Sequence, residues 1–314
     1  MSPLDCPGVY REILESLHIG VYVVDRERRI VFWNRGAEQI SGFLGQEVLG
    51  RSCRDEILVH CDNENVVLCA ERCPLLETMR DGKPSSAEIF LRHKAGHRVP
   101  VHMRVIPIKD EHGNVLGAAE TFEEPKVSAC NDRRNPNTPQ SLNHVTGLPG
   151  DKASRSALEQ HLAAYREHRI AFSLLRVHVD RLSQFMANHG ADAGGQLLRI
   201  VAQTLRNALR PSDFVGCWAE HEFVIILNIH RQKALTRVAE RLRAISSCAG
   251  IRWWGDQLSV TLSLGASVVE PEDTVETLLQ RADRGLDRSV EAGGNRLTFV
   301  PSENEAVSKD GPCS

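Results

Sequence analysis

Four cysteines stand close together in the first third of the chain: Cys53, Cys61, Cys69 and Cys73. Seven residues separate Cys53 from Cys61 and Cys61 from Cys69, three residues separate Cys69 from Cys73, and His60 precedes Cys61. Thiolates at such spacings can hold an iron–sulfur cluster or zinc. The last pair could instead form a redox-sensitive disulfide. Alternatively, all four are small buried apolar residues, and the sequence leaves these three interpretations open.

Other polar and aromatic residues of this half carry no cofactor signal. No haem-specific or flavin-specific motif is present, and Phe32 and Trp33 are expected in the hydrophobic core. Four histidines lie in predicted strands and turns without the spacing of metal ligands, so we expect them at the surface: His93, His97, His102 and His112.

The composition is that of a globular protein with two domains. The chain has 314 residues, 41% of them hydrophobic and 25% charged, with a net charge of -3. This balance lacks the basic character of a nucleic-acid binder. No apolar run is long enough for a membrane span and no signal peptide is recognisable, which predicts a cytoplasmic location. Nine cysteines, an odd number, argue against a disulfide framework.

The elements that must position these residues form two blocks. The first contains a short helix ending near Leu17, a hairpin over 20–34, a helix over 36–43 and three strands over 87–93, 99–110 and 116–122. The second alternates helices and strands, in a βααββαβ-like order that is typical of a ferredoxin-like core. The fold class is therefore α/β, more strictly α+β. One long strand is expected over 258–269.

The first block resembles a PAS domain in VYVVDRERRIVFWNRGAEQISGF and HKAGHRVPVHMRVIPIKDEHGNVLGAAETF. The resemblance implies an antiparallel sheet with short helices and a sensory role. PAS domains that precede GGDEF domains often carry an L-C-x-x-x-C-P-L element, which residues 68–75 match. We therefore expect a PAS sensor domain with a cysteine-rich insert over 1–124 and a linker over 125–142.

The second block resembles a GGDEF domain over 143–301, followed by a flexible tail over 302–314. The resemblance rests on TGLP, RPSDFVGCWAEHEFVIIL, LSVTLSLGAS and LLQRADRGLDRSVEAGGNR. It implies a nucleotide-cyclase-like palm with a ferredoxin-like core. Diguanylate cyclases of this family, from bacterial signal transduction, join two GTP molecules into cyclic di-GMP with the help of divalent metal. Residues can be compared with that chemistry one position at a time.

The metal-binding positions implied by the resemblance have changed. The family pattern D-x-D corresponds to His178-Val179-Asp180, and the signature GGDEF to AEHEF, which places His221 at the third letter. Histidine suits zinc or copper better than magnesium. The two glycines correspond to Ala219 and Glu220, where a second carboxylate would repel a triphosphate. Glu222 keeps the fourth letter.

Guanine and phosphate contacts implied by the resemblance have changed too. The guanine-binding Asn and Asp correspond to Met186 and Gly195, and the triphosphate-binding Lys and Arg to Val290 and Gly294. A site that has lost the groups hydrogen-bonding a base edge loses much of its recognition. We therefore predict that no residue here is catalytic. His178, His221, Glu222 and Asp180 could alternatively hold a transition metal, or they could simply have drifted.

The inhibitory product site of the family, R-x-x-D, is matched by Arg210-Pro211-Ser212-Asp213, six positions before the signature. In the family the Arg contacts the product and the Asp pairs with a guanine edge. Arg237 and Arg241 lie one turn apart on the next predicted helix, followed by Arg243. Alternatively, Arg210 and Asp213 form only a surface ion pair.

Three functions follow as hypotheses. The first is a PAS sensor coupled to a degenerate GGDEF domain that binds cyclic di-GMP or a protein partner. The second is a diguanylate cyclase with weak or altered activity, which would need magnesium. The third is a dimeric scaffold without nucleotide binding. Homodimers are expected in the first and third, and nucleic-acid partners in none.

Overall fold

The computed structural model describes residues 7–64, 66–69, 72–125, 142–253 and 256–300, without the side chains of 7, 252, 253, 256 and 257. The chain divides into two compact units, Met1–Ser128 and Ala129–Ser314, and each is treated by itself. Most of the predicted linker and the whole predicted tail lie outside the described residues.

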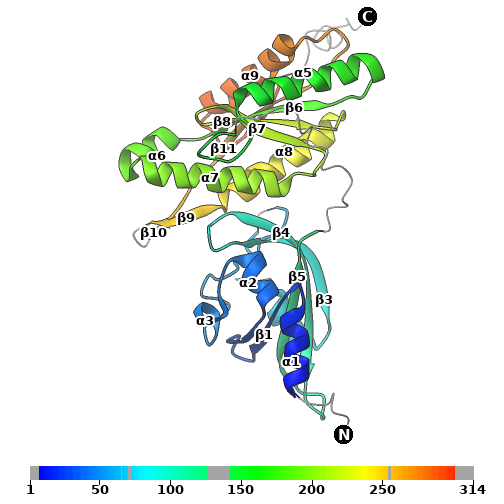
Figure 1. Ribbon diagram of the computed structural model, residues 1–314, viewed down its shortest axis with the longest axis vertical. Helices are drawn as coiled ribbons and strands as arrows, with labels where there is room; N and C mark the ends of the chain where they lie inside the picture. Colours follow the sequence, from blue (N-terminus) through cyan, green and yellow to red (C-terminus); the bar gives the residue numbers. More distant parts are fainter. Residues whose placement is uncertain (1–6, 65, 70–71, 126–141, 254–255, 301–314) are drawn as a thin grey trace, which may run out of the picture. The chain divides into compact units, whose positions relative to one another are not determined.

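The N-terminal unit is built on a five-stranded antiparallel sheet with the order β2-β1-β5-β4-β3 (Figure 1). Asn34 ties its first elements together, because the side chain accepts the N–H groups of Val21 and Ala37 and donates to Leu14 and Ile19. The strands are β1 (Gly20–Asp25), β2 (Ile30–Trp33), β3 (Ser85–Arg92), β4 (Arg98–Lys109) and β5 (Val115–Glu123), and the helices are α1 (Pro7–Ser16), α2 (Arg35–Ser41), α3 (Gly45–Val48) and α4 (Pro74–Asp81).

Three polar side chains lie inside the core of this unit. The Tyr22 hydroxyl donates to Glu120 Oε2 at 2.9 Å, and His60 Nε2 lies 3.3 Å from Glu120 Oε1. Burial raises the pKa of Glu120 to about 8 and lowers the pKa of His60 to about 4. The carboxyl group of Glu120 therefore stays protonated at neutral pH.

The C-terminal unit has a five-stranded sheet with the order β12-β11-β6-β8-β7, antiparallel except between β11 and β12. A separate hairpin is formed by β9 and β10. The elements are α5 (Asp151–His168), β6 (Ser173–Val179), α6 (Leu182–His189), α7 (Ala191–Ala208), β7 (Phe214–Ala219), β8 (Glu222–Leu227), α8 (Gln232–Ser247), β9 (Gly250–Trp253), β10 (Asp256–Ser259), β11 (Leu262–Val268), α9 (Val275–Glu291) and β12 (Leu297–Phe299).

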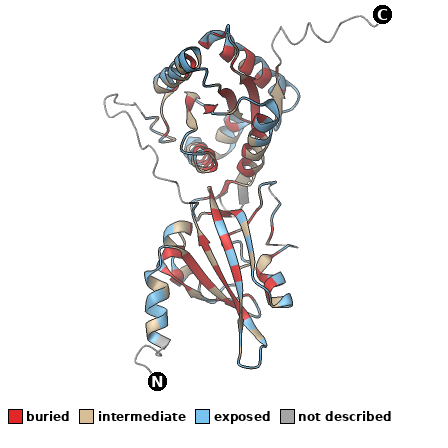
Figure 2. Cartoon of the chain, turned by 90° about the vertical axis from the view of Figure 1, so that its right-hand side faces the viewer, coloured by how far each residue is buried: buried red, intermediate tan, exposed pale blue. Residues whose placement is uncertain are grey.

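Helices cover both faces of this sheet. In Figure 1, α5 and α9 lie over one face and α7 and α8 over the other. Figure 2 shows buried residues along the strands and on the inner sides of the helices. The central strands β11-β6-β8-β7 have the order of a ferredoxin-like core, so the predicted fold class is confirmed. Among the described residues, no helix combines the length and apolar character that a membrane crossing requires.

One predicted strand is wrong. Residues 258–269 do not form a single strand, because Val260 and Thr261 separate β10 from β11. The chain leaves the β9–β10 hairpin at this point and enters the central sheet. Alternation of apolar residues continues across the break, and for this reason the sequence pattern did not reveal it.

Two glycines allow α9 to pack directly on the sheet. A Cβ atom on Gly285 would lie 2.6 Å from the carbonyl oxygen of Thr298 and 3.2 Å from the Cα of Gly265. Both neighbours are backbone atoms that cannot turn away. Close backbone approach therefore fixes α9 against β11 and β12.

Gly285→Ala should lower the free energy of unfolding by about 1–3 kcal/mol, because the added methyl group forces backbone atoms apart. Chemical denaturation of the full chain measures this change. Gly195→Ala is the matched control, since Gly195 is also helical and its added Cβ would meet nothing closer than 3.9 Å. Equal effects of the two substitutions would contradict the close packing.

Glu120→Gln should remove a pH dependence of stability. The pKa of Glu120 is raised from 4.5 to about 8 in the folded chain, so the folded state binds the extra proton between these values. Its contribution to stability is complete below about pH 4.5 and is lost as the pH rises to about 8. Wild type should lose up to ~1.4 kcal/mol per pH unit across this window relative to the variant.

Chemical denaturation at several pH values between these limits tests the Glu120 prediction. Glu124→Gln, at an exposed carboxylate, serves as the control and should keep the wild-type slope. Parallel stability curves for wild type and Glu120→Gln would show that the carboxyl group is not protonated in the folded chain.

Candidate functional site

The end of β6 and the start of β8 bring two predicted site residues together. His178 and Glu222 stand opposite each other in the strand register, and His178 Nδ1 lies 3.8 Å from Glu222 Oε1. Both side chains are half-buried, with 31% and 28% of their surface exposed. A contact of this length is longer than a hydrogen bond, so a closer partner of Glu222 dominates the site.

That closer partner is Arg176, two residues before His178 on the same strand face. Its guanidinium donates to Glu222 Oε2 and to Asp283 Oδ1, both at 2.6 Å, and lies 4.9 Å from the ring centre of Trp218. His178 and Arg176 together lower the pKa of Glu222. Glu222 is therefore an ionised carboxylate that already neutralises a buried cation of the chain.

Asp180 accepts hydrogen bonds from donors other than Arg176 and His178. Oδ2 accepts the hydroxyl of Thr261 at 2.6 Å and the N–H of Asn295 at 2.9 Å, and Oδ1 accepts the hydroxyl of Ser263 at 2.6 Å. The residue is 9% exposed. Its carboxylate thus joins the end of β6 to β11 and to the turn before β12.

The turn between β7 and β8 completes the changed signature. Ala219 and Glu220 are exposed and His221 is half-buried, and Val179 donates its N–H to the His221 carbonyl at 3.1 Å. Within the described part of the chain, no group of three or more His, Cys, Asp or Glu residues could hold a metal ion. The proposed cluster of His178, Asp180, His221 and Glu222 is therefore not assembled.

The residues present do not fit the magnesium ion that a GGDEF domain implies. Mg²⁺ prefers carboxylate and water oxygens in octahedral geometry. One retained carboxylate, Glu222, is paired with Arg176. Both oxygens of the other, Asp180, already accept hydrogen bonds. His178 and His221 offer nitrogen instead.

Positions expected to contact guanine and phosphate are apolar or lack a side chain. Met186 packs its side chain against Gly194, whose added Cβ would lie 2.2 Å from Met186 Cγ. Val290 is an exposed apolar residue. Gly294 has φ +80°, and an added Cβ would lie 3.0 Å from the Asp180 carboxylate. None of these positions, nor Gly195, supplies a hydrogen-bonding or charged side chain.

The R-x-x-D segment forms a compact turn at the end of α7. Asp213 accepts the N–H of Arg210 at 3.1 Å, so its carboxylate holds the turn, while the Arg210 side chain is exposed. Arg241, on α8, donates to the carbonyl of Ala208 at 2.9 Å, which fixes its guanidinium near this turn. Burial and the nearby Arg210 lower the pKa of Arg241, and burial raises the pKa of Asp213.

The basic residues of α8 do not all belong to this turn. Arg237 is exposed one turn before Arg241. Arg243 points elsewhere, since its guanidinium binds Glu240 at 2.8 Å and Asn295 at 2.7 Å. The structure thus groups Arg210, Asp213 and Arg241, and leaves Arg243 in a separate contact.

The described cysteines of the N-terminal unit are free thiols, and Cys53, Cys69 and Cys73 line one cavity. Cys61 and Cys73 are buried, whereas Cys53 and Cys69 are half-buried. Burial raises the pKa of Cys53 to about 12 and that of Cys69 to about 11, so these thiols are protonated at neutral pH. Among the described residues no group of three or more His, Cys, Asp or Glu is arranged to hold a metal ion, and the three interpretations of the cysteines stay predictions.

The four histidines predicted at the surface of the N-terminal unit differ in burial. His93 and His97 are half-buried and stack with ring centroids 4.3 Å apart, so their prediction as surface residues is wrong. Burial, with a contribution from His93, lowers the pKa of His97 to about 4. His102 and His112 are exposed, as expected.

Sequence reasoning missed Arg176, Asp283 and Trp218. A charged residue inside the apolar stretch AFSLLRVHV was the available signal, because a buried Arg requires a partner. The identity of that partner could not be read from the chain, since Asp283 lies 107 positions away.

Comparisons with known proteins match both units. A family model described as the PAS fold matches residues 8–123, and one described as the GGDEF domain of diguanylate cyclases matches residues 141–296. Diguanylate cyclase DgcP from Pseudomonas aeruginosa is 30% identical over 224 residues, which are 71% of this chain and 32% of that protein. Probable diguanylate cyclase DgcE from Escherichia coli is 22% identical over 302 residues, 94% of this chain and 26% of that protein.

The chain thus matches only about a third of these relatives' length or less. Among solved structures, the GGDEF domain of DgcB from Caulobacter crescentus in complex with c-di-GMP is 22% identical, with a TM-score of 0.49 over 52% of this chain and 96% of that one. The family matches and the observed topology agree in order and extent. The chain carries a PAS domain over residues 8–123 followed by a GGDEF domain over residues 141–296.

Proposed function

We propose that this chain is a cyclic di-GMP signalling protein whose GGDEF domain binds cyclic di-GMP and does not synthesise it. The PAS domain is its sensory input. Similarity to proteins named diguanylate cyclases supports the signalling context. The geometry around Glu222 supports the proposed loss of the reaction, and the geometry of the Arg210 turn supports the proposed binding of the ligand.

The single observation that carries the proposal is the Arg176–Glu222 pair. Glu222 stands at the fourth letter of the signature, and at 2.6 Å it is committed to a guanidinium that is 4% exposed. Releasing Glu222 to a metal would leave that buried cation with one partner fewer, which is costly. Phosphoryl transfer depends on neutralising phosphate charge, and the two carboxylates that would hold a metal for this purpose are already engaged with Arg176 and with neutral donors.

A ligand with phosphates and guanine edges fits the turn at Arg210. An exposed guanidinium can bind phosphate oxygens or a guanine edge through two parallel hydrogen bonds. Arg241 adds a second positive charge that is fixed by its bond to Ala208. Asp213 supplies acceptor oxygens for the N–H groups of guanine. Arg237, exposed on the same helix, extends the cationic surface.

A weak or altered cyclase is the second candidate, and retention of Asp180 and Glu222 is the observation in its favour. It would need both carboxylates to exchange their present donors for a metal. A protein-binding module or dimeric scaffold is the remaining candidate, and it requires no nucleotide at the Arg210 turn. Activity and binding measurements separate the three.

The purified full chain should make no cyclic di-GMP from GTP with Mg²⁺ or Mn²⁺. Loss of a single electrostatic group lowers an enzymatic rate ~10²–10³-fold, and several independent groups are changed here. Anion-exchange separation of the nucleotides measures the product, beside an active diguanylate cyclase assayed in parallel. Appearance of cyclic di-GMP would establish the cyclase candidate instead.

Wild type should bind cyclic di-GMP in calorimetry, and Arg210→Ala should weaken binding at least tenfold. A charged hydrogen-bonding group lost from a binding site costs ~1.5–3 kcal/mol, which is about tenfold or more in affinity. The Arg210 side chain is exposed, so folding should be unaffected.

Arg288→Ala is the matched control for charge, because it removes an exposed arginine from α9 on the opposite face of the sheet. Its affinity should equal that of wild type. Unchanged binding by Arg210→Ala would exclude this turn as the site. Absence of binding by wild type would leave the protein-binding or scaffold function.

A further inference from the structure

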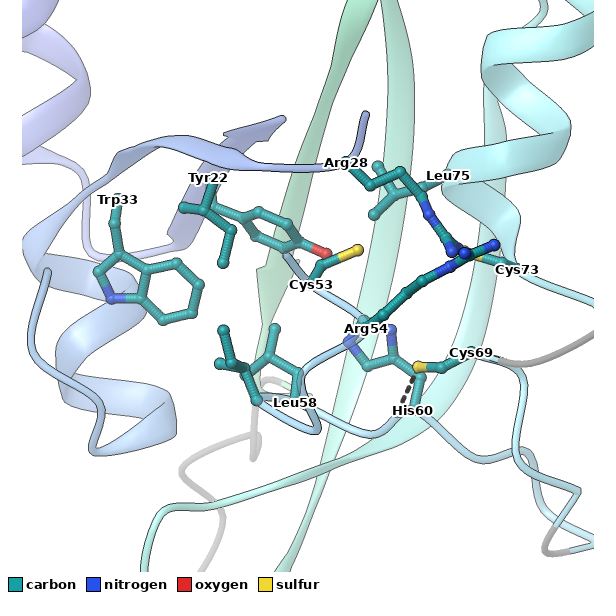
Figure 3. A pocket seen from close by; sticks show the side chains of 12 residues that line it. Tyr22, Arg28, Trp33, Cys53, Arg54, Leu58, His60, Cys69, Cys73 and Leu75 are labelled. Carbon is teal, nitrogen blue, oxygen red and sulfur yellow. Dashed lines mark hydrogen bonds between the residues drawn. The ribbon is translucent and has the colours of Figure 1, made fainter. Parts of the chain in front are cut away.

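Four side chains with metal-binding atoms line one small cavity of the N-terminal unit, beside the cysteine-rich loop over 53–73 (Figure 3). They are Cys53, His60, Cys69 and Cys73. Six residues separate Cys53 from His60, eight separate His60 from Cys69, and three separate Cys69 from Cys73. Cys61 is buried but is not among the described residues that line the cavity. The cavity thus brings together three of the four cysteines of this loop and one histidine.

The cavity is too small for an organic molecule. It leaves about 10 Å³ for the centre of a water-sized sphere, which is room for about one water. A single metal ion needs no more than that. Three cysteines with one histidine are a ligand set of closed, four-coordinate zinc sites, whereas iron–sulfur clusters are mostly held by four cysteines. Size and ligand set therefore both favour zinc.

Backbone contacts hold these residues at the cavity. The Cys53 N–H donates to the carbonyl of Arg28 at 3.0 Å, and the His60 N–H donates to Cys69 Sγ at 3.2 Å. Cys73 directly precedes α4, and its side chain makes no capping hydrogen bond there. The positive end of the helix dipole favours a thiolate at this position. An N–H donor on sulfur favours the thiolate of Cys69 in the same way.

Arg28 carries the charge that would balance such a site. Zinc with three thiolates and a neutral imidazole has one negative charge. The Arg28 side chain lines the same cavity, the residue is 4% exposed, and its Nη1 and Nη2 atoms make no hydrogen bond to any described residue. The described lining residues include no Asp or Glu. An unpaired buried cation is costly, so a negatively charged metal site is a suitable partner for it.

His60 lies beside the second partner that a metal-bound histidine needs. A ligating imidazole usually donates the N–H of its other ring nitrogen to a carboxyl group or a carbonyl. His60 Nε2 lies 3.3 Å from Glu120 Oε1, although these two atoms make no hydrogen bond among the described residues. This contact leaves Nδ1 of His60 for the metal.

We propose that Cys53, His60, Cys69 and Cys73 bind one zinc ion, with three thiolates and one imidazole nitrogen as ligands and Arg28 as the balancing charge. Each thiol gives its proton to solvent when it binds the ion. No three such groups are arranged to hold a metal ion in the described part of the chain. Binding therefore requires the sulfur atoms to turn toward a common point by changes of side-chain rotamer.

The zinc site goes beyond the proposed function and lies in the other unit of the chain. Its residues belong to Met1–Ser128, whereas the Arg210 turn belongs to Ala129–Ser314. Failure of zinc binding would therefore leave the proposed cyclic di-GMP site untouched, and the converse also holds.

Metal binding by the full chain tests the proposal. The protein is purified under reducing conditions, freed of metal with a chelator and titrated with Zn²⁺ alone in calorimetry. We expect one ion per chain, a raised melting temperature and the release of three protons, one from each thiol. Repeating the titration in buffers of different ionisation enthalpy counts these protons. Co²⁺ in place of Zn²⁺ should give the visible absorption of a tetrahedral thiolate site.

Substitutions of neighbouring residues separate this ligand set from others. His60→Ala and Cys73→Ser should each weaken zinc binding ~100-fold or more, since even an outer partner of a metal ligand is worth ~10–100-fold. Cys73→Ser should also release one proton fewer. Cys61→Ala removes a cysteine outside the cavity and should bind as wild type does. Arg28→Gln should weaken binding ~10-fold or more, and Arg29→Gln, at an exposed arginine of the same turn, should not.

Wild-type binding is the first readout, so a variant that fails to fold does not decide the outcome. Folded wild type that binds neither Zn²⁺ nor Co²⁺ would overturn the proposal. Equal losses of affinity in Cys61→Ala and His60→Ala would overturn the ligand set. Iron together with acid-labile sulfide in the purified chain would overturn zinc in favour of a cluster.

Discussion

The buried guanidinium of Arg176 is neutralised by two carboxylates, and this pairing organises the centre of the GGDEF domain. Arg176 lies on the central strand and binds Glu222 on β8 and Asp283 on α9, above the ring of Trp218. Leaving such a charge without its partner costs several kcal/mol. The same pairing that holds the helix to the sheet engages Glu222, so the contact that stabilises the domain is also the one on which the proposed loss of the reaction rests.

Asp180 is also engaged within the domain, but its partners are neutral hydrogen-bond donors and not a cation. Two hydroxyl groups and one backbone N–H fill its oxygens, and they link β6, β11 and the turn before β12. Gly294 lies next to these hydrogen bonds, because a side chain there would approach the Asp180 carboxylate. The position at which the resemblance implies a phosphate-binding arginine thus has no room for one without displacing Asp180. Asp180 and Glu222, which the resemblance places in the active site, thus act as cross-links within the domain.

Local patterns in the sequence predict most of the fold, because hairpins and amphipathic helices repeat over short distances. They predict the order of strands and the positions of the changed site residues, but not the break at Val260, where apolar alternation continues. They also fail for contacts made across the chain. Asp283 is 107 positions from Arg176, and Arg28 stands in the charged turn DRERR, which is typical of exposed residues. Burial of a charge depends on tertiary packing, which no short pattern records.

Retention of the Arg210 turn is physically separate from the changes at the active site. Its shape depends on a local bond from Asp213 to the backbone of Arg210 and on the contact of Arg241 with Ala208. Among the described residues, no hydrogen bond or ion pair joins these groups to Arg176, Glu222 or Asp180. The shape of the turn therefore does not depend on the residues at the changed signature, and an exposed guanidinium beside a fixed one needs no metal to attract a phosphate. The proposed binding of cyclic di-GMP at Arg210 is for this reason independent of the proposed loss of phosphoryl transfer.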